Sequence, residues 1–154
     1  MRPLLKLRLP VAALLYAVVD AACVGAGMGV PVFCIFLGLL VGWYSARREI
    51  ARARNFGQVL SGTLRQAAIA AGITLLMMAV IWGRCTVMLF DPNADLANFG
   101  IPQILYHARA SFIGWLVLMI VISPVLQFLV AIFASHLTLL RRISIYETGA
   151  RRVM

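Results

Sequence analysis

The residue best suited to chemistry in this sequence is Asp20, a carboxylic acid set among valine and alanine residues. A charged carboxylate at the centre of a bilayer costs about 2.5–3.5 kcal/mol, so an acid in such a stretch faces other helices, pairs with a cation or holds a proton. Two interpretations follow. Asp20 is either a proton or cation site, or a structural partner of Arg84 or of the glycine turn that comes after it.

Three further polar residues lie within apolar stretches, namely Thr74, Ser123 and Gln127. Ser123 and Gln127 are four residues apart, so a helix places them on one face. Together with Asp20 and Arg84 they form the candidate ion or proton site. The alternative is that they join helices through hydrogen bonds, each worth well under about 2 kcal/mol.

Cys23, Cys34 and Cys85 carry the soft sulfur ligands that Cu(I) prefers. Their spacing includes no C-x-x-C pair and no paired histidine, which are typical of metal sites. Scattered cysteines are common in apolar helices, and this favours a packing role. Free thiols, a disulfide and a metal site all stay open at this point, but we expect no metal and no cofactor.

The sequence contains none of the residue sets that hydrolytic or metal enzymes use: no H-E-x-x-H motif, no Ser/His/Asp set and no paired carboxylates. His107 and His136 lie near opposite ends of one apolar stretch, about 43 Å apart along a helix, and cannot share a site. Asp91 and Asp95 flank a Pro-Asn turn, which explains them. We therefore expect that the protein is not an enzyme.

The amino-acid composition indicates the environment in which the candidate residues lie. The chain is 63% hydrophobic and 12% charged, whereas soluble domains carry about 25% charged residues. This sequence has too few polar side chains to cover a water-facing surface, so it belongs in a bilayer. We predict an all-α fold, an integral membrane four-helix bundle that forms a single domain over residues 1–154, with spans of about 9–24, 30–46, 67–84 and 108–138.

A tight turn separates the first two predicted spans. A single helix over residues 9–44 would be about 54 Å long, against a hydrocarbon core of about 30 Å. The glycine-rich residues 25–29 permit a turn, and Pro31 suits the first turn of the next helix. The first two spans are therefore predicted to be antiparallel, although the first is short for a membrane span.

The basic residues define the predicted orientation. Nearly all of the 14 Lys and Arg residues lie before the first span, in a basic linker over 45–66, or after the fourth span. Four spans bring these three segments to one side, which the positive-inside rule makes cytoplasmic. We expect a multi-pass protein of the plasma (inner) membrane with both termini in the cytoplasm. Topology explains the net charge of +9, and we expect no nucleic-acid partner.

The basic linker has two interpretations. In the first, the second helix continues to about Asn55, and a short amphipathic piece after Gly57 lies on the membrane surface. Arginines of the linker then contact anionic lipid headgroups. In the second, the segment is a solvated linker that sets the topology. The candidate headgroup residues are Arg47, Arg48, Arg52 and Arg54.

Small residues at helical spacing predict close helix packing. Gly38 and Gly42 form a G-x-x-x-G motif in the second span, and Ala68 and Gly72 form a similar pair in the third. The partner of each face is either another span of this chain or a separate subunit. The sequence does not choose between them.

The fourth helix is predicted to begin near Pro102 and to run past the outer loop, which covers residues 84–107. Pro124 lies within its apolar stretch and is expected to kink it, which frees the backbone carbonyl near Ile120. The Ser123 hydroxyl is available to satisfy part of this freed backbone.

Two functional hypotheses follow, in this order. The first is a non-catalytic component of a membrane assembly, which packs against itself or against other subunits through its small-residue faces. The second is a small proton- or cation-coupled transporter or channel that acts as an oligomer, with Asp20 as its protonatable site.

Overall fold

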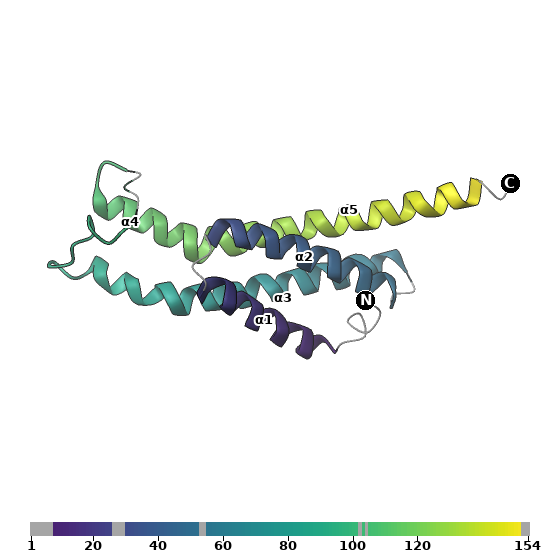
Figure 1. Cartoon of the computed structure of the whole chain (residues 1–154), viewed down its shortest axis with the longest axis horizontal. Helices are drawn as coiled ribbons and strands as arrows, with labels where there is room; N and C mark the ends of the chain where they lie inside the picture. Colours follow the sequence, from purple (N-terminus) through teal and green to yellow (C-terminus); the bar gives the residue numbers. More distant parts are fainter. Residues whose placement is uncertain (1–7, 26–29, 53–54, 102, 104, 152–154) are drawn as a thin grey trace.

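The computed structural model describes residues 8–25, 30–52, 55–101, 103 and 105–151, and every regular element in these ranges is a helix. α4, η3 and α5 follow one another without a break, so the described residues form four helical rods (Figure 1). This confirms the prediction of an all-α chain with four helices. The elements are α1 (Leu9–Gly25), α2 (Val30–Ile50), α3 (Phe56–Gly83), the 3-10 helix η2 (Arg84–Leu89), α4 (Ala108–Val117), the π-helix η3 (Leu118–Ile122) and α5 (Ser123–Arg151).

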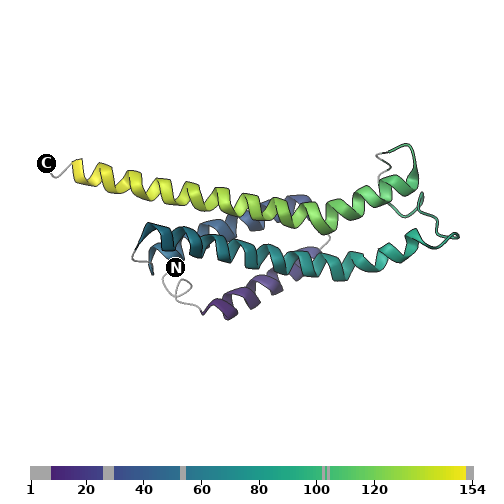
Figure 2. The same ribbon diagram turned by 180° about the vertical axis from the view of Figure 1, so that it is seen from behind.

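Two long antiparallel rods form the frame of the molecule, α3 with η2 and α4–η3–α5, and they run side by side (Figure 2). Within them, Phe56–Leu89 and Ala108–Arg142 are long and apolar enough to cross a membrane, with mean hydropathy of 1.8 and 2.7 in their most apolar windows. Leu9–Val24 in α1 is a shorter apolar helix. By length and composition, the structure therefore has two helices able to span a bilayer.

The shorter hairpin of α1 and α2 packs along one side of this frame. α2 runs parallel to α5 and makes its most extensive contacts with it. A Cβ atom on Gly38 would lie 2.7 Å from the backbone oxygen of Gln127. One on Gly42 would collide with the backbone oxygen of Ala131 and lie 2.8 Å from the Cβ of Ala134. The G-x-x-x-G face of α2 is thus used inside this chain, where the lack of side chains lets the two backbones approach.

The buried apolar core lies near the turn end of this hairpin. Phe33, Cys34, Leu37 and Met78 are almost fully buried there and bring α2 onto α3. Nearer the outer loop, the rings of Trp82 on α3 and Trp115 on α4 meet edge to face, with centroids 4.4 Å apart. These contacts hold the long rods together beyond the point where the hairpin ends.

The break before Pro124 takes the form of a π-helical turn at η3. Proline has no backbone N–H to donate to the carbonyl four residues earlier, and a π-turn absorbs the mismatch within a continuous helix. The Ser123 hydroxyl donates to the backbone oxygen of Leu118 at 2.8 Å. The Leu118 oxygen also accepts the backbone N–H of Ser123, so the hydroxyl bonds a carbonyl that already has a donor rather than the Ile120 carbonyl that we expected it to satisfy.

The predicted linker and the start of the fourth helix need correction. α2 ends at Ile50, short of Asn55, and α3 already begins at Phe56, so most of residues 45–66 belong to helix ends. Asn55 has the extended backbone of a helix N-cap (φ −128°, ψ 149°), so the chain turns there and Gly57 lies inside the helix. The fourth helix begins at Ala108, not near Pro102, which lies outside the described residues.

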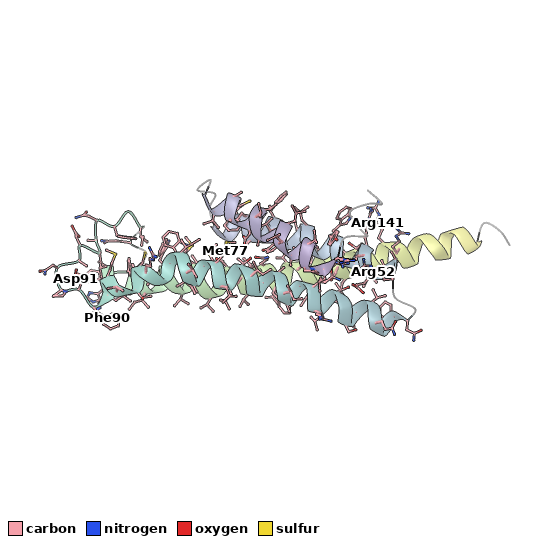
Figure 3. The ribbon with its side chains drawn as sticks, turned by 90° about the horizontal axis from the view of Figure 1, so that it is seen from below. Arg52, Met77, Phe90, Asp91 and Arg141 are labelled. Carbon is pink, nitrogen blue, oxygen red and sulfur yellow. The ribbon has the colours of Figure 1, made fainter. Side chains whose placement is uncertain are left out.

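The two ends of the molecule differ in charge. Arg52 and Arg141 lie toward one end, whereas Phe90 and Asp91 lie at the other, in the loop that joins the long rods (Figure 3). The start of α1 and the end of α5 point toward the arginine end (Figure 1). The charge asymmetry of the sequence is therefore also an asymmetry of the folded chain.

The close approach of α2 to α5 is testable with matched glycine variants. Gly42→Leu is expected to lower the free energy of unfolding by about 1–3 kcal/mol or more, because the side chain collides with the α5 backbone. Gly114→Leu is the control, since a Cβ there meets nothing within 4 Å and leucine favours a helix. Unfolding of the detergent-solubilised variants is followed by circular dichroism, and equal stability of the two would contradict this packing.

Candidate functional site

Asp20 lies in the interior of the helix assembly. Its side chain is 0% exposed, and its Oδ2 accepts a 2.9 Å hydrogen bond from the hydroxyl of Thr74 on α3. Thr74 is also fully buried. The one acid of α1 is thereby joined to the middle of α3, where no bulk water reaches it.

Tyr16 and Gln127 extend this contact into a chain across three helices. The Tyr16 hydroxyl lies 2.5 Å from the Thr74 hydroxyl, and the Gln127 side-chain amide donates to the Tyr16 oxygen. When Asp20 is ionised it can only accept, so the single Thr74 proton is donated to Asp20 and Tyr16 donates to Thr74. Donation therefore runs in one direction, from Gln127 on α5 through Tyr16 and Thr74 to Asp20. Hydrogen bonds aligned in this way polarise and strengthen one another.

Two side-chain oxygen atoms of this cluster accept no hydrogen bond from the described residues. Asp20 Oδ1 and Gln127 Oε1 are buried and have no hydrogen-bond donor among the described residues. A buried acceptor without a donor costs about 1–3 kcal/mol, and more when it is charged. The cluster thus has spare acceptor capacity for a proton, a water molecule or a small cation, which hard oxygen ligands favour.

The other two residues of the predicted ion site lie apart from the cluster's hydrogen bonds. Ser123 is buried, but its hydroxyl donates to the backbone oxygen of Leu118 on the same rod. Arg84 is exposed at the start of η2, about 15 Å further along the rod than Thr74. The carboxyl group of Asp20 hydrogen-bonds a hydroxyl rather than this guanidinium.

A narrow crevice leads from the arginine end of the molecule to Tyr16. It lies between α1, α2 and α3, and its volume of about 60 Å³ is enough for water. Tyr44, Arg48 and Gln66 line it together with apolar residues of all three helices. Gln66 in turn donates to the carboxylate of Glu49 at the end of α2. The crevice places a space large enough for water beside Tyr16, and a second, apolar cavity between α1 and α2 also reaches Tyr16.

Cys23 packs against the core cluster that contains Cys34, whereas Cys85 lies on η2. Cys34 is buried in the apolar core, whereas Cys23 and Cys85 are half-buried, and all three thiols are free. Within the described ranges no three His, Cys, Asp or Glu residues come together as metal ligands. The outer-loop acids are used locally: Asp91 accepts from the backbone N–H of Asn93, and Asp95 accepts from Asn98, which lowers the pKa of Asp95.

The predicted packing and headgroup residues have varied surroundings. Ala68 is exposed, and a Cβ on Gly72 would meet nothing within 4 Å, so this face of α3 is open. Arg47 lies over the ring of Trp43, Arg48 is buried, and Arg52 is exposed. Arg54 lies outside the described residues.

The sequence analysis missed Tyr16, the central member of the cluster. Its signal was available, because Tyr16 and Asp20 are four residues apart and share one face of α1. A tyrosine hydroxyl in an apolar helix needs a partner for the same reason that the carboxyl group does. The contact between Glu49 and Gln66 could not be predicted from sequence spacing in this way, because the two residues lie on different helices.

The role of the cluster has to be argued from its own chemistry. No protein-family model, curated protein or solved structure matches this chain. The residues offer a buried carboxyl group at the end of a directed chain of donors, with unused oxygen acceptors beside it.

Thr74 and Thr63 provide a matched test of the cluster. Both are buried on α3 and both contact the carbonyl four residues earlier, but only Thr74 also donates to Asp20. Thr74→Val is expected to lower the free energy of unfolding by about 1–2 kcal/mol, because it leaves Asp20 without a donor. Thr63→Val should cost less than about 0.5 kcal/mol. Titration with a denaturing detergent measures both values, and equal losses would rule out a special contact at Asp20.

Proposed function

We propose that this chain is a non-enzymatic, multi-pass protein of a plasma (inner) membrane and that the Asp20 cluster binds a proton or small cation for transport. The observation that carries this proposal is the burial of Asp20 with one carboxyl oxygen bonded to Thr74 and the other without a donor. All four helical rods cross or enter the bilayer, with the start of α1 and the end of α5 on the cytoplasmic side.

Surface chemistry supports the membrane location and the orientation. Many large apolar side chains on α1, α3 and α5 are exposed among the described residues, as a surface in contact with lipid requires. Arginines gather at one end of the molecule, and the positive-inside rule assigns that end to the cytoplasm. In the proposed orientation Asp20 lies within the apolar part of the bilayer, where water is scarce.

The scarcity of water supports an ion-binding role for the cluster. Acids inside membranes are costly and typically mark proton or ion pathways. A proton on Asp20 or a small cation held by Asp20, Thr74, Tyr16 and Gln127 would use the oxygen atoms that lack a donor. The crevice beside Tyr16 supplies the route from the cytoplasmic side, and the π-turn at η3 gives the long rod an adjustable point close to Gln127.

A second candidate function is that of a subunit in a larger membrane assembly, and the open Ala68–Gly72 face supports it. This face is free for another helix because none of the described residues lies within 4 Å of a Cβ at Gly72, and Ala68 is exposed. Gly38 and Gly42 no longer support this candidate, since α5 occupies their face. The two functions are compatible, because a four-helix unit is thin and transport favours a second copy.

The transport proposal is tested in liposomes that carry the purified protein and a trapped pH indicator. Wild-type protein is expected to move protons, or labelled sodium in a parallel assay, faster than empty liposomes. Asp20→Asn should reduce the flux to the empty-liposome level, because the amide cannot gain or lose a proton at neutral pH. Asp91→Asn is the control, since it removes a carboxylate from the exposed loop and should leave the flux unchanged. Normal flux through Asp20→Asn would refute the proposal.

The assembly proposal is tested by native mass spectrometry of protein extracted gently from its own membrane. Ala68→Leu with Gly72→Leu is expected to convert an oligomer or complex to the single chain, because the added side chains block close helix approach. Gly114→Leu, on another open helix face, serves as the control. An unchanged complex in the double variant would show that this face is not the contact.

A further inference from the structure

A basic pocket lies between α2 and α5 at the arginine end of the molecule, away from the Asp20 cluster. Its volume is about 410 Å³. It contains three guanidinium groups, and no acidic residue lines it within the described part of the chain. The lining residues are Trp43, Arg47, Leu137, Thr138, Arg141 and Arg142.

The pocket is built by two helices. Arg47 comes from α2 and its guanidinium carbon lies 4.6 Å from the centre of the Trp43 ring, which orients the planar cation. Arg141 and Arg142 come from α5. Thr138 donates its hydroxyl proton to the carbonyl of Ala134, so the donors left for a ligand are those of the arginines. The three cations are adjacent only because α2 and α5 pack in parallel.

Exposed apolar side chains continue along both helices beyond the pocket, on the side away from the arginines. Leu39 lies one helical turn before Trp43 on α2 and is 43% exposed, and Phe133 lies one turn before Leu137 on α5 and is 60% exposed. A ligand that fits has an anionic group at the arginines and a hydrocarbon chain along these side chains. Membrane phospholipids with acidic headgroups have this form.

We propose that this pocket binds the phosphate headgroup of an anionic phospholipid, with an acyl chain against Leu39 and Phe133. Arginine presents a planar set of donors that matches phosphate oxygens, and basic pockets between membrane helices on the cytoplasmic side hold such headgroups. The site differs from the expected surface contact of Arg47, Arg48, Arg52 and Arg54, because it draws on Arg141 and Arg142 of α5. It is also independent of ion binding at Asp20.

The proposal is tested by native mass spectrometry of the full chain in detergent, titrated with phosphatidylglycerol or with phosphatidylcholine of the same acyl chains. Wild-type protein is expected to bind one phosphatidylglycerol at least tenfold more tightly than phosphatidylcholine. Arg141→Gln with Arg142→Gln should weaken phosphatidylglycerol binding by roughly 30-fold. Arg65→Gln with Arg84→Gln is the control, because it removes the same charge from two exposed positions on α3 and η2.

Three results would overturn the proposal. These are equal affinity for the two lipids, wild-type affinity in the Arg141/Arg142 variant, and displacement of the lipid by millimolar inorganic phosphate. The last result would make the occupant a soluble phosphate. Circular dichroism checks that the double variant is folded. If it is not, Arg47→Lys decides, because it keeps the charge but loses the planar donors, and a lipid affinity equal to that of wild type would contradict the proposal.

Discussion

The carboxyl group of Asp20 has to be satisfied inside an apolar helix assembly, and the arrangement of α1 depends on how this is done. Apolar surroundings offer no hydrogen bonds, so a polar group buried among them must find partners within the protein. Thr74 supplies one donor directly, and Tyr16 and Gln127 orient it. This chain sets both the rotation and the depth of α1, whose remaining contacts with the other helices are few and apolar.

Gln127 links this interior chain to the helix frame. Its side chain donates to Tyr16, while its backbone oxygen lies where Gly38 of α2 comes closest to α5. Because Gly38 and Gly42 have no side chain, α2 packs closely on α5. The same contact fixes the position of Gln127, which begins the chain of hydrogen-bond donors. The same parallel packing brings Arg47 close to Arg141 and forms the basic pocket. One close helix contact therefore supports two separate sites.

The fold could be predicted from the sequence in its main features because they follow from hydropathy and turn residues. Four apolar stretches predict the helices and their order, whereas the predicted glycine-rich turn falls on residues 26–29, outside the described residues. The ends of the helices were harder, because the polar residues 56–66 form a helix that continues the apolar part of α3. The amphipathic piece was expected to begin after Gly57, but the helix begins at Phe56, with Asn55 as its N-cap.

The candidate site was predictable only in part. Asp20, Thr74 and Gln127 were grouped because each is polar within an apolar stretch, and the structure brings these three together. Tyr16 was overlooked because tyrosine is common in apolar helices, although its spacing from Asp20 was informative. Arg84 and Ser123 were grouped with these residues because they are also polar and close to apolar stretches, but they lie outside the cluster. The position of a side chain along its helix, and whether its own backbone takes up its hydrogen bond, depend on packing.

The most direct test of this account is a double-mutant cycle between Asp20→Ala and Thr74→Val, measured as free energies of unfolding in the same detergent system. A hydrogen bond between the two side chains predicts a coupling energy of about 0.6 kcal/mol and at most about 1.7 kcal/mol, the mean and the maximum found for hydrogen bonds between membrane helices. Additive effects, within about 0.3 kcal/mol, would contradict the account, because they would show that Asp20 and Thr74 do not depend on each other.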